Sequence, residues 1–245
     1  MNASGSGGSA RTRMTRRSYL IVAALALAFG FAGAALWSLS GLGHDRTRDY
    51  LLDHPELLAE MAERYEDKLA GERVAAVAQD VVAPFPGAVL GNPEGTVTLV
   101  EFTDYGCTYC RMSNPDVARL VAENPDLRVV IREWPIFRGS DAAARMALAA
   151  AKQGKFAAFH DAMFELGPPD STTIEQAARA AGLDLSEARD FAASDEASRE
   201  VAKNMELAER LGFNGTPSWV VGDTAFAGAV GYDALQEAIA AARGS

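Results

Sequence analysis

The chain has 245 residues, of which 49% are hydrophobic, and a formal net charge of −10. That length suits one large domain, or one domain with a smaller appendage. Four of the 23 basic residues precede an apolar run near the N-terminus, which leaves 19 basic against 33 acidic residues, a charge of −14, for the rest. Such a surface repels phosphate backbones, so the composition disfavours nucleic-acid binding.

Residues 1–17 are predicted to be a disordered N-terminus, because they open with the Gly/Ser-rich stretch MNASGSGGS. The following run, 18–40, contains no charged residue. At ~1.5 Å rise per residue, one helix of that length crosses a ~30 Å hydrocarbon core. Arginines precede the run and the next one is Arg46. This asymmetry predicts a cytoplasmic N-terminus, a single-pass anchor in the inner membrane, and an extracytoplasmic remainder.

A cleaved signal peptide is the alternative interpretation of this run. The small residues Ala32, Gly33 and Ala34 fit a cleavage site. The run is longer than an ordinary signal core, and it ends in Trp37, a residue typical of membrane interfaces. Cleavage would leave a soluble periplasmic protein. Both interpretations place the rest of the chain in a compartment where disulfides form.

Residues 46–80 are predicted to form a helical stalk. Leu51, Leu58 and Tyr65 are seven residues apart, which is a helical period and gives the helix a broad apolar stripe. That stripe needs a partner surface, so the stalk either lies on the main domain or associates with other copies of the chain. Residues 81–95, rich in Pro and Gly, are predicted to be a linker.

A compact α/β domain is predicted over 96–245. Two apolar, β-rich runs at 96–102 and 127–134 flank a helical pattern, which is the order of a βαβ unit. An Ala-rich, all-helical block follows at about 139–211. Residues 217–228 read as a β-hairpin, and a closing helix follows it.

The two cysteines, Cys107 and Cys110, form a CxxC motif directly after the first of these strands. Two thiols at this spacing can hold a metal ion, close a structural disulfide, or exchange disulfides with other proteins. A zinc site needs about four ligands, whereas the chain has only these cysteines and three dispersed histidines. A structural disulfide over so short a loop stabilises little. No zinc site is therefore predicted, although Cu(I), a soft ion, could be held by the two thiolates.

The chain resembles the DsbA-like branch of the thioredoxin superfamily. The resemblance covers roughly 88–243 and is carried by GNPEGTVTLVEFTDYGCTYC, by NGTPSWVVGD and by the Ala-rich helical block. A shorter segment, YLLDHPELLAEMAERYE, resembles the N-terminal helical region of ScsC-like proteins, which makes oligomers in some relatives. The resemblance implies an α/β, thioredoxin-like fold with an all-helical insertion, preceded by the transmembrane helix and the helical stalk.

The resemblance also implies a function: a thiol:disulfide oxidoreductase, either an oxidase or an isomerase, that needs no cofactor. Its substrates would be cysteine-containing exported proteins, and a DsbB-like or DsbD-like membrane protein would reset its dithiol. Two other functions stay open, a copper-binding protein of copper tolerance and a membrane-tethered assembly or binding factor.

The predicted catalytic residues are Cys107, Cys110 and Glu101. If a helix starts at Cys107, its dipole and free N–H groups lower the pKa of that thiol, in such motifs to ~3.5–7.5. Cys107 is then the exposed nucleophile, and Cys110, one turn along, is the buried resolving thiol of a redox disulfide, Cys107–Cys110. Glu101 lies in the strand before them, where DsbA-like proteins carry an acid, and is expected to relay the proton of Cys110.

The predicted substrate-binding residues are Thr216, Pro217, Tyr105, Tyr109 and Thr108. The resemblance implies a cis Thr216–Pro217 bond that faces the cysteines, with the Thr216 backbone free to pair with a substrate strand. Tyr105, Thr108 and Tyr109 flank the cysteines and are expected to line the substrate groove.

Three other residues are expected to have no catalytic role. They are Trp134, Trp219 and His160.

Overall fold

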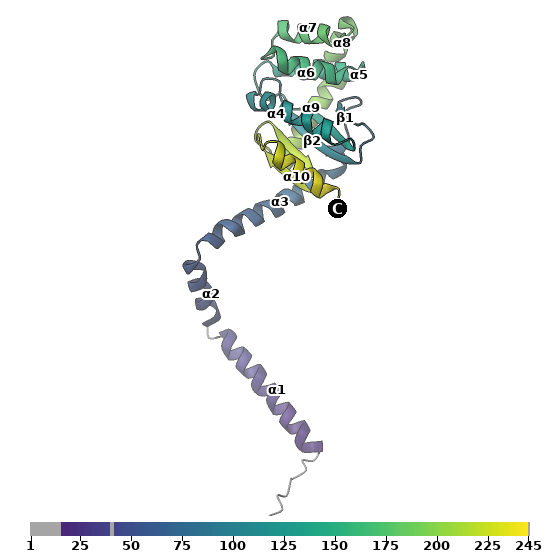
Figure 1. Ribbon diagram of the computed structural model, residues 1–245. Coiled ribbons are helices and arrows are strands. Elements are labelled where there is room, and N and C mark those ends of the chain that lie inside the picture. Colours follow the sequence, from purple (N-terminus) through teal and green to yellow (C-terminus); the bar gives the residue numbers. More distant parts are fainter. Residues whose placement is uncertain (1–15, 40–41, 245) are drawn as a thin grey trace, which may run out of the picture. The chain divides into compact units, whose positions relative to one another are not determined.

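The computed structural model describes residues 16–39 and 42–244 (Figure 1). The predicted disordered N-terminus therefore lies outside the described residues, except for Arg16 and Arg17, which begin the first helix. The chain separates into an N-terminal unit that ends at Glu63 and a larger unit that begins at Arg64.

The N-terminal unit begins with an apolar helix, α1 (Arg16–Leu39). Its stretch Tyr19–Trp37 has a mean hydropathy of 2.2 and is long enough to cross a membrane. The apolar side chains described in this stretch are exposed. The structure thus confirms the predicted N-terminal apolar helix, which fits a membrane span or a signal sequence.

Two helices, α2 (Leu42–Asp53) and α3 (Glu56–Val82), form the segment predicted as the stalk. They are separated at Pro55, because proline lacks the N–H that a helix interior needs and disfavours the helical conformation of the residue before it. The part of α3 from Arg64 onward belongs to the larger unit. There Val74, Val77 and Val81 are buried against the central sheet.

A five-stranded sheet forms the centre of the larger unit, with the order β1-β3-β2-β4-β5. Its strands are β1 (Val89–Gly91), β2 (Val97–Thr103), β3 (Leu127–Glu133), β4 (Ser218–Val221) and β5 (Thr224–Ala227). Strands β2 and β3 are parallel and are joined through α4 (Thr108–Glu123), whereas the other pairs are antiparallel. This arrangement confirms the predicted βαβ unit, the hairpin and the thioredoxin-like α/β fold.

Strand β1 corrects the prediction of a linker over 81–95. It pairs antiparallel with β3, with Val89 opposite Val130, and so forms one edge of the sheet. The sequence did not reveal this strand because it has only three residues between prolines and glycines. Such a short segment cannot show an alternation of apolar and polar residues. The folded domain therefore includes most of the predicted linker.

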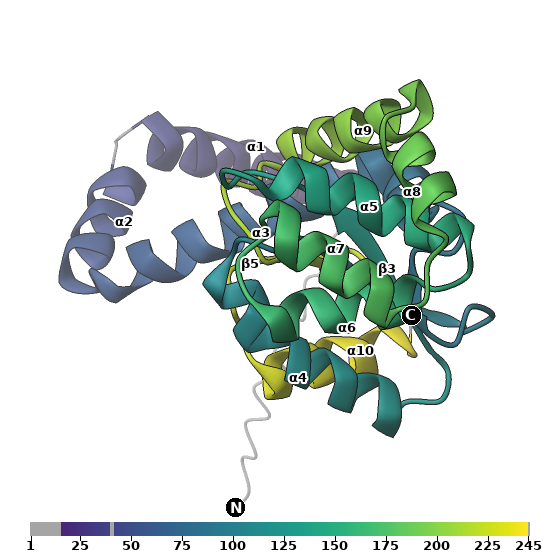
Figure 2. The ribbon, with the colours of Figure 1, turned by 90° about the horizontal axis from the view of Figure 1, so that it is seen from above.

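Five helices lie between β3 and β4, where the helical insertion is predicted. They are α5 (Ser140–Lys152), α6 (Phe156–Leu166), α7 (Ser171–Ala180), α8 (Leu185–Ala192) and α9 (Asp195–Leu211). Helices α5, α6 and α7 lie side by side (Figure 2). Helix α9 is bounded by an N-cap, Ser194, and by Gly212, whose left-handed φ of 75° ends the helix. A closing helix, α10 (Tyr232–Ala242), follows the hairpin.

The core has two halves, because alternate residues of the strands point to opposite faces of the sheet. One face, the α4 face, contains Leu99, Ile131 and Trp219 and is covered by α4, α6 and α10. The opposite face, the α9 face, contains Phe102 and Val130 and is covered by α3 and α9. The cysteines belong to the core of the α4 face.

Candidate active site

Cys107 is the N-cap residue of α4. Its φ of −84° and ψ of 120° are extended, as an N-cap requires. Its Sγ accepts a hydrogen bond from the Cys110 N–H at 3.3 Å, so the sulfur takes the place of the usual capping oxygen. The unpaired N–H groups of the first turn therefore point toward this sulfur and favour its thiolate form.

The two thiols differ strongly in acidity. The pKa of Cys107 is lowered to about 6, chiefly by its hydrogen bond with the Cys110 side chain and further by backbone N–H groups of the first turn. Burial raises the pKa of Cys110 well above its ordinary value, and Cys107 and the nearby Glu101 add to this effect. Both thiols are free in this structure. Cys107 is therefore the thiol that ionises first, while Cys110 keeps its proton.

Cys107 is buried, which corrects the sequence-based prediction of an exposed nucleophile. Only 2% of its surface is accessible, and Cys110 is fully buried. Cys107 is covered because the Thr216–Pro217 segment lies over it, and its S–H donates a hydrogen bond to the Thr216 carbonyl oxygen at 3.2 Å. The Thr216 carbonyl therefore lies directly against the reactive sulfur.

The Thr216–Pro217 segment comes from the other end of the domain and meets the cysteines across 109 residues of sequence. Its peptide bond is cis, as the sequence resemblance predicts. Both residues are buried, and the Thr216 hydroxyl has no hydrogen-bond partner among the described residues. The backbone of Thr216 is thus the polar group nearest to the reactive sulfur from outside its own helix.

Glu101 lies on β2, opposite Ile131 of β3 and Trp219 of β4. It is 2% exposed, and burial raises its pKa to about 8, with a smaller contribution from Cys107. Glu101 in turn raises the pKa of Cys110, so the two groups are electrostatically coupled. The carboxyl is therefore mostly neutral at pH 7. Because its pKa is close to neutral, it can both donate a proton to a sulfur that ionises beside it and accept one.

Tyr105 does not line a substrate groove, which corrects the prediction made for it. It is fully buried, and its hydroxyl lies 2.9 Å from Glu133 Oε1 and 3.0 Å from His160 Nδ1. The tyrosine faces inward because the loop after β2 continues the α4 face of the sheet. Thr108 and Tyr109, on the first turn of α4, are exposed, Tyr109 by 61%, and their contact with substrate stays a prediction.

Asp104 fixes the loop that carries Cys107, a role that the sequence did not reveal. One carboxylate oxygen accepts the Gly106 N–H at 2.6 Å, and the other accepts the N–H groups of Ile136 and Phe137 at 2.6 and 2.8 Å. Its carbonyl oxygen accepts the Cys107 N–H at 3.0 Å. Aspartate before a helix is an ordinary capping signal, which would have suggested such a role.

Gly106 allows this loop to pack closely. A Cβ atom there would lie 2.7 Å from Ser140 Oγ and 3.0 Å from Phe137 Cβ. Any larger residue would push the loop away from the start of α5 and displace Cys107.

Glu133 and His160 are the two other buried polar residues of the site that sequence reasoning missed. Glu133 ends β3, and His160 lies on α6 in the insertion. An acid inside an apolar strand is a signal that singled out Glu101 and applies equally to Glu133. His160 gives no such signal, because only the fold brings it to Tyr105. Trp134 and Trp219 are buried aromatic residues of the core, as expected.

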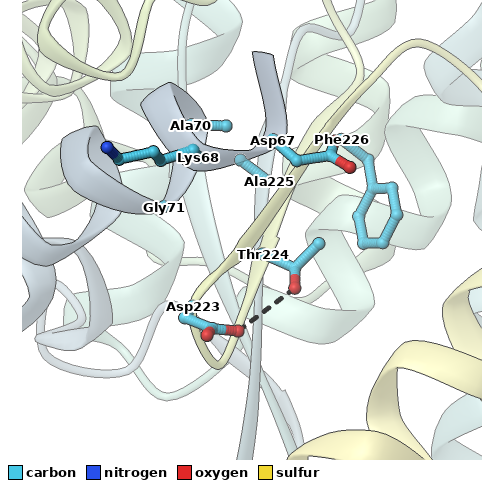
Figure 3. A pocket seen from close by; sticks show the side chains of 8 residues that line it. All are labelled: Asp67, Lys68, Ala70, Gly71, Asp223, Thr224, Ala225 and Phe226. Carbon is cyan, nitrogen blue, oxygen red and sulfur yellow. Dashed lines mark hydrogen bonds between the residues drawn. The ribbon is translucent and has the colours of Figure 1, made fainter. Parts of the chain in front are cut away.

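The remaining cavities do not include the predicted site residues. The pocket in Figure 3, about 490 Å³, lies between α3 and β5, and Asp67, Lys68, Asp223, Thr224 and Phe226 are among its eight lining residues. Across residues 16–39 and 42–244, no three His, Cys, Asp or Glu side chains come together as a metal site.

Comparison with known proteins agrees with this geometry. The family described as the DSBA-like thioredoxin domain matches residues 98–240. A thioredoxin-like oxidoreductase from Silicibacter pomeroyi has 47% identity and a TM-score of 0.62, over 64% of this chain and 92% of that chain. The catalytic domain of Proteus mirabilis ScsC has 26% identity and a TM-score of 0.64, over 71% of this chain and 99% of that chain.

Curated relatives extend beyond the aligned region. The Na(+)/H(+) antiporter NhaA 3 of Salinispora tropica is 31% identical over 168 residues, which are 66% of this chain and 25% of the antiporter. The chain thus spans about a quarter of the length of the curated relatives it matches, and the antiporter activity is a property of those proteins. The family match shows that the chain belongs to the DsbA-like thioredoxin domain family, and the fold and the capping dithiol agree with this membership.

Proposed function

We propose that this protein exchanges disulfides with cysteine-containing exported proteins through Cys107 and Cys110. The observation that carries the proposal is the place of the Cys107 sulfur at the N-cap of α4, where its pKa is lowered to about 6. At neutral pH most of this thiol is ionised, and the thiolate is the form that attacks and leaves in disulfide exchange.

In the oxidising direction, a substrate thiolate attacks the Cys107 sulfur of the Cys107–Cys110 disulfide. The S–S bond breaks, a mixed disulfide forms on Cys107, and the electron pair leaves on the Cys110 sulfur. That sulfur needs a proton at once, because it is buried and its pKa is raised. Neutral Glu101 supplies it. A second substrate thiolate then attacks the substrate sulfur, which releases Cys107 as a thiolate and leaves the substrate oxidised by two electrons.

In the reverse direction, the Cys107 thiolate attacks a substrate disulfide, and ionised Glu101 takes the proton of Cys110 so that Cys110 can release the product. Isomerisation uses the first of these steps and a return to the thiolate. The direction in the cell depends on a membrane partner. A quinone-linked, DsbB-like protein would oxidise the dithiol, and a DsbD-like carrier would reduce it.

Substrate contacts are proposed at the backbone of Thr216 and at Pro217, with Thr108 and Tyr109 on the opposite side. Two further apolar residues, Ile136 and Phe137, are 43% and 47% exposed, and Asp104 holds their backbone beside the cysteine loop. An apolar rim of this kind suits extended segments of proteins that have not finished folding.

The proposed location is the inner membrane, with a cytoplasmic N-terminus and an extracytoplasmic catalytic domain. Support comes from the apolar stretch of α1 and from the arginines that precede it. Release as a soluble periplasmic protein after signal cleavage is the alternative. The N-terminal sequence of the mature protein, recovered from the membrane or the periplasm, distinguishes the two.

Self-association through the stalk is also proposed. The apolar side chains of Leu51, Leu52, Leu58 and Met61 are exposed and line a hollow of about 490 Å³ within the N-terminal unit. Such a surface is stabilised by burial against another copy. Light scattering of the detergent-solubilised protein, with and without α2, would show an oligomer that becomes a monomer; a monomer in both cases contradicts the proposal.

The decisive experiment for the exchange function measures the alkylation rate of the full-length protein in detergent against pH. The rate should follow the ionisation of Cys107 with a midpoint near pH 6, as its lowered pKa requires. The oxidised protein should also catalyse disulfide formation in a reduced, unfolded ribonuclease. A midpoint at the ordinary cysteine value of about 8.5, or no catalysis, would contradict the proposal.

A further inference from the structure

A buried triad of polar side chains lies beneath the dithiol. The hydroxyl of Tyr105 is within hydrogen-bonding distance of Glu133 Oε1, at 2.9 Å, and of His160 Nδ1, at 3.0 Å. All three side chains are fully buried. They come from three parts of the fold, namely the loop that carries Cys107, strand β3 and helix α6 of the insertion. The Tyr105 hydroxyl thus joins the insertion to the sheet directly below the cysteine loop.

The Tyr105 hydroxyl makes two contacts but has only one hydrogen to donate, so the second contact needs a hydrogen from its partner. A phenol has a single O–H, so it can donate to Glu133 or to His160 but not to both at once. In this structure the Tyr105 O–H donates to Glu133 Oε1, so its contact with His160 requires a proton on His160 Nδ1. Neutral His160 in that tautomer completes both hydrogen bonds. The outer atoms, Glu133 Oε2 and His160 Nε2, are buried and have no hydrogen-bond partner in the described chain.

The surroundings of Glu133 disfavour a negative charge. An ionised carboxylate would leave Oε2 without a partner in a fully buried site, which costs several kcal/mol. The ionisable neighbours of the triad are the acids Glu101, Asp104 and Asp161, and His160 is neutral because burial lowers its pKa to about 3. The adjacent residue, Arg132, binds Glu200 and Asn204 of α9, on the α9 face. Burial accordingly raises the pKa of Glu133 well above its ordinary value.

The triad is connected to the reactive sulfur through a short piece of backbone. Tyr105 precedes Cys107 by two residues, and the carbonyl of Asp104 accepts the Cys107 N–H at 3.0 Å. On the inner side, Tyr105 is held by Glu133 and His160; on the outer side, the Asp104 carboxylate is held by backbone N–H groups. Because the loop is held at both points, the position of Cys107 at the start of α4 is fixed.

We propose that Tyr105, Glu133 and His160 form an uncharged, hydrogen-bonded triad that positions Cys107 at the N-cap of α4, with Glu133 protonated and His160 neutral. The inference rests on the proposed function for the role of Cys107 as nucleophile. The three are positioning residues, since each acts on the sulfur through the loop. Neutral Glu133 also leaves Glu101 as the single buried carboxyl that changes charge with Cys110, because two neighbouring carboxylates in one buried site cannot both ionise.

The first test measures the pKa of Cys107 by thiolate absorbance in the folded, reduced full-length protein, without substrate. Tyr105→Phe keeps the ring and removes the hydroxyl, and should raise the pKa of Cys107 by about one unit. Tyr232→Phe is the matched control, because its exposed hydroxyl binds Glu123 far from the cysteines in sequence and should leave that pKa unchanged. A Tyr105→Phe protein that loses stability but keeps the wild-type Cys107 pKa would overturn the positioning role.

The second test addresses Glu133. Glu133→Gln is uncharged and keeps an oxygen that accepts the Tyr105 O–H, so it should keep the low pKa of Cys107, whereas Glu133→Leu should raise it. Should Glu133→Leu fail to fold, infrared spectroscopy still decides where the proton lies. In a Glu101→Gln background at neutral pH, the carbonyl band of a buried protonated carboxyl should remain, and adding Glu133→Gln should remove it. If that band is missing before Glu133 is changed, the carboxyl is ionised and the proposal is wrong. Neither readout depends on exchange activity, so both can fail independently of the proposed function.

Discussion

The buried ionisable side chains on the two faces of the central sheet differ in whether they have partners of opposite charge. On the α4 face, Glu101 and Glu133 are buried beneath the cysteines, and burial raises the pKa of both. On the α9 face, Arg132 is fully buried and its guanidinium group has a complete set of acceptors. These are Glu200, Asn204 and the carbonyl oxygens of Asp80, Val81 and Ala83.

The two faces therefore have different roles: the α4 face contains the groups of the proposed reaction, and the α9 face contains contacts that hold the fold together. The acids of the α4 face have no basic partner within hydrogen-bonding distance in the described chain. Burial keeps Glu133 protonated, so Glu101 is the acid whose protonation state can change with that of Cys110. Arg132 cannot lose its proton, and it binds the last carbonyl groups of α3, which otherwise lack partners. The α4 face should therefore respond to redox state and pH, and the α9 face should only hold α3 and α9 on the sheet.

The largest effect is expected from the cysteines. Cys107→Ser removes the nucleophile and should lower disulfide exchange by at least about 10³-fold, while thermal unfolding changes little. Cys110→Ser leaves the nucleophile without its resolving thiol, so covalent adducts with substrate should accumulate. Mass spectrometry of non-reduced samples checks this. Exchange that persists in Cys107→Ser would place the chemistry elsewhere.

Arg132→Met should be the most damaging change on the α9 face. It leaves the acceptors of α3 and α9 unpaired and should lower the free energy of unfolding by about 3–5 kcal/mol, as the loss of one partner from a buried ion pair does. Denaturant titration measures this. The redox equilibrium of the folded protein with glutathione should stay the same. A shifted redox equilibrium would mean that the two faces are not independent.

Glu101 should make the stability of the protein depend on pH. Its pKa is raised from 4.5 to about 8, so the folded protein disfavours the ionised form. The stabilisation is fully present below the unfolded value and is lost as the pH rises through the folded one. From about pH 5 to about pH 7, it should fall by about 2–3 kcal/mol. Glu101→Gln should remove this slope, and identical slopes in both proteins would show that Glu101 titrates normally.

A smaller effect is expected at the loop that carries Cys107. Gly106→Ala places a Cβ atom 2.7 Å from Ser140 Oγ, and should cost about 1–3 kcal/mol of stability and slow exchange. Gly215→Ala is the matched control, since a Cβ there meets nothing within 4 Å. Thermal unfolding and exchange kinetics of the two variants test whether close packing, rather than glycine itself, matters at Gly106.

Much of the fold follows from local patterns. The two central strands, the helix after the cysteines, the helical insertion and the hairpin each have a clear period or a turn signal. Strand β1 has neither, because three residues between prolines and glycines cannot show a period. The docking of the last turns of α3 was left open because an apolar stripe shows that a helix needs a partner, without showing which one.

The candidate site was only partly predictable for the same physical reason. Cys107, Cys110 and Glu101 lie close together in sequence, so a strand followed by a helix is enough to bring them together. His160 reaches Tyr105 only through the packing of α6 on the sheet, a contact that no local pattern encodes. The burial of Cys107 escaped prediction because the Thr216 carbonyl that covers it lies 109 residues away.

The Cys107–Thr216 contact lets one residue accompany the sulfur through both of its charge states. While Cys107 holds its proton, the Thr216 carbonyl accepts it. Once the proton departs, that carbonyl no longer accepts the S–H, and the Thr216 hydroxyl, which has no hydrogen-bond partner in the described chain, can donate to the sulfur anion. Ionisation of Cys107 thus changes the hydrogen bonding of Thr216, so the charge of the sulfur and the state of the backbone beside it are linked.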